Sequence, residues 1–127
     1  MSAPFAPQRE RYTVVHMFAG SGGCSSGFEE DGFETIAAID NDADACADLN
    51  YLLNKQVSVC ADILTMHPVD LLRIVGRRRP DVFVSTPPCK GWSRLLGKDK
   101  RKSPKYVEMC SLAVRSVWLA MHTWDEP

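Results

Sequence analysis

One cysteine of the chain stands in a setting that suits a nucleophile. The stretch DVFVSTPPCKGWSR, residues 81 to 94, places Pro87 and Pro88 directly before Cys89 and Lys90 directly after it. Each proline fixes φ and removes a backbone donor, so Cys89 cannot belong to a regular strand or helix. A thiol attacks as its thiolate and needs partial exposure and a fixed direction. We therefore expect Cys89 to be a candidate nucleophile on a stiff loop.

The other cysteines suit buried, inert thiols, because they lie in periodic segments or beside apolar neighbours. Cys24 is a partial exception, since the N-terminus of a predicted helix beside it lowers a thiol pKa. The count of five is odd and contains no CxxC pair, which argues against a disulfide framework and a zinc site. Free thiols indicate a reduced, cytoplasmic protein without a bound metal. The other four are Cys24, Cys46, Cys60 and Cys110.

A basic segment follows the candidate nucleophile. Between Lys90 and Lys105 there are seven lysines or arginines and one acid, Asp99, so the local net charge is +6 although the whole chain carries −1. Such a segment either lies along nucleic-acid phosphates or is a solvated loop.

The first strand runs into a glycine-rich loop, FAGSGGCSSGF, with glycines at 20, 22, 23 and 27. The dinucleotide pattern GxGxxG is absent because Ser25 stands where its third glycine is needed, and no Gly-Lys-Ser/Thr phosphate loop follows. The remaining interpretations are a turn that lets a ligand approach the backbone and a plain turn.

Two acids follow the next two strands. Asp40 comes 20 residues after Gly20, where a carboxylate accepts hydrogen bonds from ribose hydroxyls or caps a helix. Asp62 follows the third strand and accepts from an adenine amino group or caps a turn. Three consecutive strand ends with such features favour an adenosine-type pocket.

Strands and helices alternate along the chain. This order predicts an α/β fold with a doubly wound parallel sheet, in the strand order 3-2-1-4, and ligands bind such sheets at the carboxyl ends of the strands. The predicted strands are 12–18, 34–39, 57–60 and 81–85; the predicted helices are 24–31, 41–55, 68–76 and 106–124, the last apolar at 107, 110, 114, 117, 118 and 121.

Size and composition suit one globular domain. The 127 residues, with 45% hydrophobic and 24% charged, match an ordinary globular chain, and no apolar run approaches the roughly 20 residues that span a membrane. Residues 1–11 lack an apolar signal-peptide core and predict a disordered lead, which leaves residues 12–127 as the domain.

Four motifs follow one another along the chain, and their order and spacing are informative: MFAGSGGCSSGF, AAIDND, ADI and PPCKGWSR. Together they resemble the DNA (cytosine-5)-methyltransferase family over residues 13 to about 124. The resemblance implies a Rossmann-like fold that binds S-adenosylmethionine and acts on double-stranded DNA. It implies that Cys89 attacks carbon 6 of a flipped-out cytosine, so that carbon 5 can take the methyl group.

The resemblance also implies binding roles for matching positions. His16, Lys90 and Trp92 depart from the family pattern, and Lys90 either stabilises the thiolate or contacts DNA. The implied cofactor residues are Phe18, Ala19, Gly20, Ser21, Gly22, Gly23, Asp40, Asn41, Asp62, Ile63 and Pro87; the implied DNA residues are Pro88, Lys90, Ser93, Arg94, Lys98, Lys100, Arg101 and Lys102.

The family needs parts that do not follow Trp124: a Glu-Asn-Val strand, later arginines and a target-recognition region. Strand 81–85 is also apolar on both faces and would lie at a sheet edge, which invites another strand. We therefore expect the N-terminal portion of a catalytic domain or one half of a split enzyme. Alone it should bind cofactor weakly, self-associate through the edge of strand 81–85, and not methylate. The alternatives are a non-catalytic nucleotide-binding or interaction module and a tRNA cytosine-5 methyltransferase.

Overall fold

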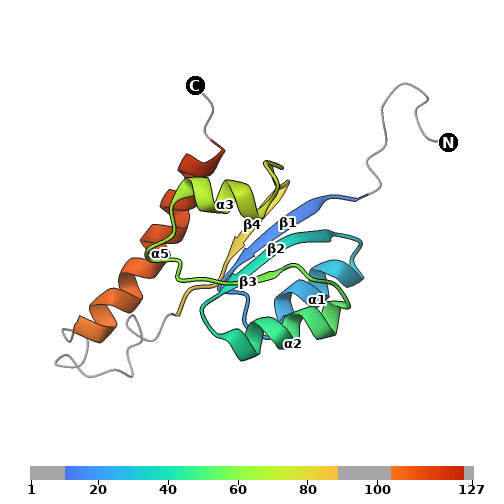
Figure 1. Cartoon of the computed structure of the whole chain (residues 1–127), viewed down its shortest axis with the longest axis horizontal. Helices are drawn as coiled ribbons and strands as arrows, with labels where there is room; N and C mark the ends of the chain where they lie inside the picture. Colours follow the sequence, from blue (N-terminus) through green and yellow to red (C-terminus); the bar gives the residue numbers. More distant parts are fainter. Residues whose placement is uncertain (1–10, 89–103, 125–127) are drawn as a thin grey trace.

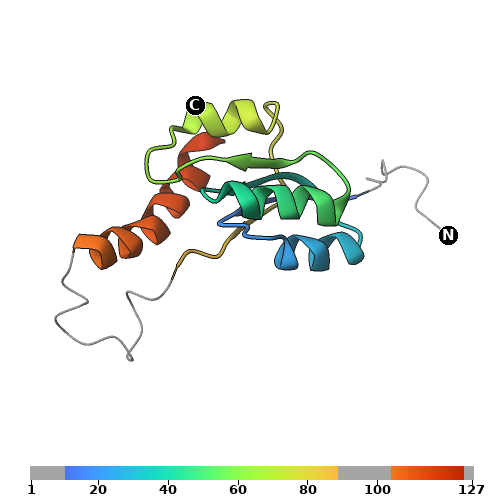
Figure 2. The ribbon, with the colours of Figure 1, turned by 60° about the horizontal axis from the view of Figure 1, so that its bottom comes forward.

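A four-stranded parallel sheet lies between two pairs of helices (Figure 1). The structure is a computed structural model that describes residues 11–88 and 104–124. Helices α1 and α2 cover one face and α3 and α5 the other, as the turned view in Figure 2 also shows. The strands are β1 (Thr13–Met17), β2 (Glu34–Asp40), β3 (Ser58–Cys60) and β4 (Val82–Ser85); the helices are α1 (Gly23–Glu30), α2 (Ala43–Leu53), α3 (Pro68–Ile74) and α5 (Pro104–Thr123).

The sheet order is β3-β2-β1-β4, which confirms the predicted fold class and order. Each strand pair is parallel, with Met17 beside Ile39 in β2 and beside Ser85 in β4. All four strands therefore end at the same edge of the sheet, where polar and glycine residues follow them. This edge of the sheet is therefore where we expect a ligand-binding site.

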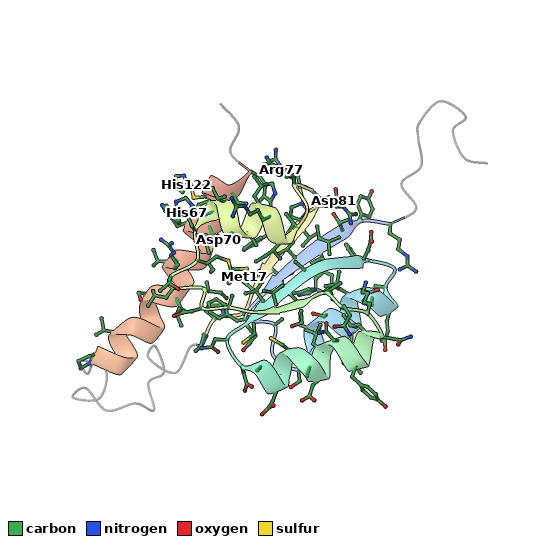
Figure 3. The ribbon with its side chains drawn as sticks, viewed as in Figure 1. Met17, His67, Asp70, Arg77, Asp81 and His122 are labelled. Atoms are coloured by element: carbon green, nitrogen blue, oxygen red, sulfur yellow. The ribbon has the colours of Figure 1, made fainter. Side chains whose placement is uncertain are left out.

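Local signals set the helix boundaries. The carboxylate of Asp42 accepts hydrogen bonds from the N–H groups of Asp44 and Ala45 and caps α2. The α3 helix has Pro68 at its first turn, as predicted, and a reciprocal cap between His67 and Asp70, both labelled in Figure 3. The residues that begin these helices thus specify them locally.

The larger core lies between the sheet and helices α3 and α5. Val15, Met17 and Ile39 point to this side and are fully buried against Leu71 of α3 and Leu119 of α5. Met17 lies between the sheet and these helices in Figure 3. The alternate residues of β1 face α1 and α2, because successive strand side chains point to opposite faces.

Replacing Leu119 by alanine is expected to lower the free energy of unfolding by about 2 to 5 kcal/mol. Leu119 is 0% exposed, so the change leaves a cavity against Met17 and Leu71. Val117→Ala on the same helix is the control, because Val117 is 58% exposed and its truncation should cost at most about 0.5 kcal/mol. Urea unfolding followed by circular dichroism measures both; equal losses would contradict this packing.

The β4 strand is a sheet edge within residues 11–88 and 104–124. All four residues of β4 are half-buried, because β4 pairs with β1 along only one of its two edges. Ser85 and Ser116 of α5 share a hydrogen bond with a 2.8 Å separation of their Oγ atoms, which joins the strand to the helix. The predicted edge position of this strand is confirmed.

The apolar residues that the sequence places along α5 mostly face solvent. Val114, Val117 and Met121 are 68%, 58% and 64% exposed, whereas the buried side of the helix carries Ser116 and Leu119. The α5 helix contacts α3 and β4 along one side, so only the residues on that side are buried. In the described part of the chain, α5 therefore presents an apolar outer face.

The expectation that Cys60 is buried is wrong. Cys60 is the last residue of β3, an outer strand of the sheet, and its side chain is exposed. Partial desolvation of the thiol raises the pKa of Cys60. The neighbouring Cys46 thiol and the nearby acids Asp40 and Asp42 raise this pKa further. Cys46 is buried, as predicted, whereas Cys24, whose exposure was not predicted, is exposed.

Candidate cofactor and active site

A cavity of about 340 Å³ opens at the carboxyl ends of the strands. In doubly wound sheets, ligands bind at this end. The volume lies within the usual range for pockets that take a small organic ligand. Its lining is Phe18, Asp40, Asn41, Ala61, Asp62, Ile63, Thr86, Pro88 and Leu112.

Asp40 joins the glycine loop to the start of α2. Its Oδ2 accepts from the N–H of Gly20 at 2.9 Å, and its Oδ1 accepts from the N–H of Asp42 at 3.0 Å. Asp42, not Asp40, caps the helix, so the capping alternative for Asp40 is wrong. A carboxylate held by two backbone donors keeps a fixed direction and retains lone pairs for a ligand.

The glycine loop adopts a backbone that few side chains tolerate. Phe18, Gly20 and Gly22 have φ values of +57°, +59° and +101°. A Cβ at Gly22 would lie 3.0 Å from Cγ of Leu49 in α2, so this glycine allows α1 and α2 to pack closely. A Cβ at Gly20 would meet no atom within 4 Å, so open space adjoins this part of the loop.

Asp62 occupies the turn after β3. Its Oδ1 accepts from the N–H of Leu64 at 2.9 Å, and its carbonyl accepts from the N–H of Met66 at 3.0 Å. The turn-capping role is therefore present. Asp62 also lines the cavity beside Ile63, and a turn-capping carboxylate can still accept from a ligand through its second oxygen.

The cavity brings together six of the residues predicted from sequence. Three further residues of the lining were not predicted: Ala61, Thr86 and Leu112. Thr86 could have been found from sequence, because it is a polar residue at the end of a strand. Leu112 could not, because it reaches the site only through the packing of α5. The predicted residues in the lining are Phe18, Asp40, Asn41, Asp62, Ile63 and Pro88, whereas Ala19, Gly20, Ser21, Gly22, Gly23 and Pro87 are not part of it.

The nucleophile loop lies beyond Pro88, the last residue before the gap in the described chain. The predicted residues outside the described ranges are Cys89, Lys90, Ser93, Arg94, Lys98, Lys100, Arg101 and Lys102. The described part of the site ends one residue before the candidate nucleophile.

Another hollow, of about 640 Å³, lies at the opposite end of the sheet. It is lined mostly by charged side chains, and two of them, Arg78 and Glu34, pair with each other. Figure 3 shows Asp81 at this end, near the start of β1. It holds none of the residues predicted for the site. Within residues 11–88 and 104–124 no cluster of metal-ligating side chains occurs, and no helix is long and apolar enough to cross a membrane.

His16 is a buried histidine next to the glycine loop. It is 1% exposed and its ring packs edge-on against Phe28 of α1, with 5.3 Å between ring centroids. Burial lowers the pKa of His16, and the nearby Glu29 only partly opposes this effect. His16 is therefore neutral at pH 7.

Stability is expected to fall as the pH drops below about 6.5, the ordinary pKa of histidine. Above this pH both states hold neutral His16. Below it the unfolded chain takes up a proton that the folded chain resists until its own, lower pKa, so the free energy of unfolding decreases. His16→Asn should flatten the profile below pH 6.5, and His122→Asn, which replaces an exposed histidine, is the comparison variant. Thermal melts across this range measure both variants; an unchanged His16→Asn profile would contradict the assignment.

Known proteins resemble this chain in sequence and fold. Over 86 residues it is 38% identical to type II methyltransferase M.XorII of Xanthomonas oryzae, a match that covers 66% of this chain and 20% of M.XorII. It is 38% identical over 93 residues to M.DdeI of Desulfomicrobium norvegicum, a match that covers 72% of this chain and 21% of M.DdeI. M.HgiGI of Herpetosiphon aurantiacus is 28% identical over 119 residues, a match that covers 85% of this chain and 86% of M.HgiGI. The chain thus spans about a fifth of the length of M.XorII and M.DdeI.

The fold of the S. pombe Dnmt2 methyltransferase matches with a TM-score of 0.63 and 18% identity, over 92% of this chain and 34% of that one. This likeness supports the Rossmann-like methyltransferase fold. The sequence model of the C-5 cytosine-specific DNA methylase family matches residues 12–115. The chain belongs to the C-5 cytosine-specific DNA methylase family.

Proposed function

We propose that this chain contributes the cofactor site and the nucleophile of an enzyme that methylates carbon 5 of cytosine in DNA. The observation that carries the proposal is the cavity at the carboxyl ends of the strands, lined by Asp40 and Asp62 and ending at Pro88, one residue before Cys89. Relatives of bacterial origin, such as M.XorII and M.DdeI, together with a DNA substrate, would place its action in the cytoplasm of a bacterial host.

The residues of the cavity suit S-adenosylmethionine. Asp40, held by the N–H groups of Gly20 and Asp42, would accept from the ribose hydroxyls. Asp62 and Ile63 would hold the adenine, one through a carboxylate oxygen and the other through an apolar contact. The bound cofactor supplies the methyl group; the protein contributes binding and orientation.

Cys89 would act on the cytosine itself. Attack of the thiolate on carbon 6 makes carbon 5 nucleophilic and divides one difficult substitution into two easier ones. The base must first leave the duplex, at a cost of a few kcal/mol. The basic residues from Lys90 to Lys102 would lie along the phosphates, so the affinity for DNA should fall as the salt concentration rises.

A covalent trap tests this function. The chain is combined with the C-terminal part of a relative such as M.XorII, S-adenosylmethionine and DNA that carries 5-fluorocytosine, whose fluorine blocks release of the adduct. We expect a denaturation-resistant protein–DNA complex. No complex, while S-adenosylhomocysteine still binds, would favour a nucleotide-binding module without catalytic activity.

We further propose that the edge of β4 and the outer face of α5 form a docking face for the rest of the catalytic domain. Two adjoining hollows support it: one is lined by Phe83, Ala120 and Trp124, the other by Val117 and Trp118, and both share Met121. An unpaired strand edge beside exposed apolar side chains suits an added strand with its apolar cover.

On its own, the chain should associate with itself through this docking face as its concentration rises. Met121→Lys is expected to lower the associated fraction several-fold, because a charge would be buried in the contact. Leu52→Lys on α2 is the matched control, since Leu52 is also an exposed apolar residue but lies on the other side of the sheet. Light scattering after size-exclusion chromatography measures both; an equal effect of the two variants would contradict the docking face.

A further inference from the structure

Thr86 connects the strand before the nucleophile to the glycine loop. Its hydroxyl donates to the carbonyl of Phe18 at 3.1 Å, and its N–H donates to the carbonyl of Met17 at 3.3 Å. Phe18 and Thr86 also lie together in the lining of the cavity. One residue therefore contacts the proposed cofactor site from the side on which the Pro-Pro-Cys sequence begins.

The peptide between Phe18 and Ala19 is held at both of its polar atoms. Its oxygen accepts from Thr86, and its N–H donates to the carbonyl of Ile39 at 3.1 Å. Phe18 has a φ of +57°, a conformation that costs energy for a residue with a side chain and persists only where neighbours fix it. The hydroxyl of Thr86 is thus one of the contacts that set the direction of this peptide.

The residues after Thr86 transmit its position. Pro87 and Pro88 have no N–H and a fixed φ, so the backbone between Thr86 and Cys89 is stiff but carries no donor of its own. Thr86 is the last residue before Cys89 with both a backbone and a side-chain donor. A change in the position of Thr86 would therefore reach Pro88, the residue before Cys89.

We propose that Thr86 is a positioning residue that couples occupation of the cavity to the placement of Cys89. The inference rests on the proposed function, because a cofactor must occupy the cavity. A ligand against Phe18 would restrain the Phe18–Ala19 peptide, the hydroxyl of Thr86 would be restrained with it, and the two prolines would carry that restraint to Cys89. Binding at one site would thereby change the reactivity at the other.

The test compares the alkylation rate of Cys89 with and without S-adenosylhomocysteine. Iodoacetamide labels the full chain, and peptide-resolved mass spectrometry separates Cys89 from the other thiols. We expect the ligand to change the rate at least about 5-fold in the wild type, the lower end of typical coupling between sites. In Thr86→Val, which keeps the shape but loses the hydroxyl, the ratio should approach 1. Thr86→Ser should restore it.

Ser85→Ala is the matched control. Ser85 also carries a hydroxyl at the end of β4, but its partner is Ser116 of α5 and not the glycine loop. Its loss should lower stability and leave the ratio of rates unchanged. Thermal melts of all variants show that they are folded.

The outcomes separate this proposal from the proposed function. A wild-type ratio in Thr86→Val, or a ratio near 1 in Thr86→Ser, would overturn the coupling while leaving the cofactor site in place. Failure of S-adenosylhomocysteine to bind the wild-type chain, measured by titration calorimetry, would overturn both. A ratio near 1 in the wild type despite binding would overturn the coupling alone.

Discussion

Replacing Cys89 by serine is expected to lower cytosine methylation at least about 10⁴-fold when the rest of the catalytic domain is supplied, since loss of a catalytic nucleophile costs up to about 10⁶-fold in other enzymes. A hydroxyl has a far higher pKa than a thiol, so almost no nucleophilic anion forms at neutral pH. Incorporation of labelled methyl groups into DNA measures the rate. The affinity for S-adenosylhomocysteine should not change, because the proposed cofactor contacts precede residue 89.

Cys24→Ser is the matched control for this experiment. Cys24 is exposed and lies in α1, close to the glycine loop in sequence, but not in the cavity lining. Its replacement should leave methylation within about 2-fold of the wild type, as surface changes usually do. Equal rates for Cys89→Ser and the wild type would remove the covalent mechanism.

The second large effect is expected at Asp40. Alanine there removes the acceptor for the N–H groups of Gly20 and Asp42 and the proposed partner of the ribose. Leaving a part-buried donor without an acceptor costs about 1 to 3 kcal/mol of folding stability. We expect the Kd for S-adenosylhomocysteine to rise about 100-fold, since both the ligand contact and the shape of the loop are lost.

Titration calorimetry measures this Kd, and thermal melts separate binding from folding. Asp48→Ala is the control, because Asp48 is an exposed acid on α2 and changes the net charge equally. Asp40→Asn should fall between the two variants, as an amide oxygen can accept only part of what the carboxylate accepts. A wild-type Kd in Asp40→Ala would exclude Asp40 from the cofactor site.

Much of the fold could be predicted from sequence because its signals are local. Apolar β-branched runs indicate strands, Asp42 and Pro68 begin helices, and their alternation favours a parallel sheet. The positions of Asp40 and Asp62 after strands then predicted one polar edge, and the cavity there contains both. The family motifs added the predicted role of Cys89.

The remaining features depend on contacts between distant segments. The apolar residues of α5 gave no sign of which would face solvent, because that depends on where the helix meets α3 and β4. Cys60 was misjudged since its exposure follows from the outer place of β3. The bond from Thr86 to Phe18 spans 68 residues, and nothing in either local sequence indicates it.

The central position of β1 has a consequence for how the chain folds during synthesis. Its β4 partner lies far along the sequence: the Thr13 N–H donates to the Asp81 carboxylate across 68 residues. At roughly 5 to 20 residues per second, the ribosome delivers β4 several seconds after β1. Until then the apolar side chains of Val14, Val15 and Met17 have an incomplete sheet around them, and pairings this distant in sequence close slowly. The β1 strand, with four of its five residues buried, can pair early with β2 but completes its sheet pairing only after β4 has been synthesised.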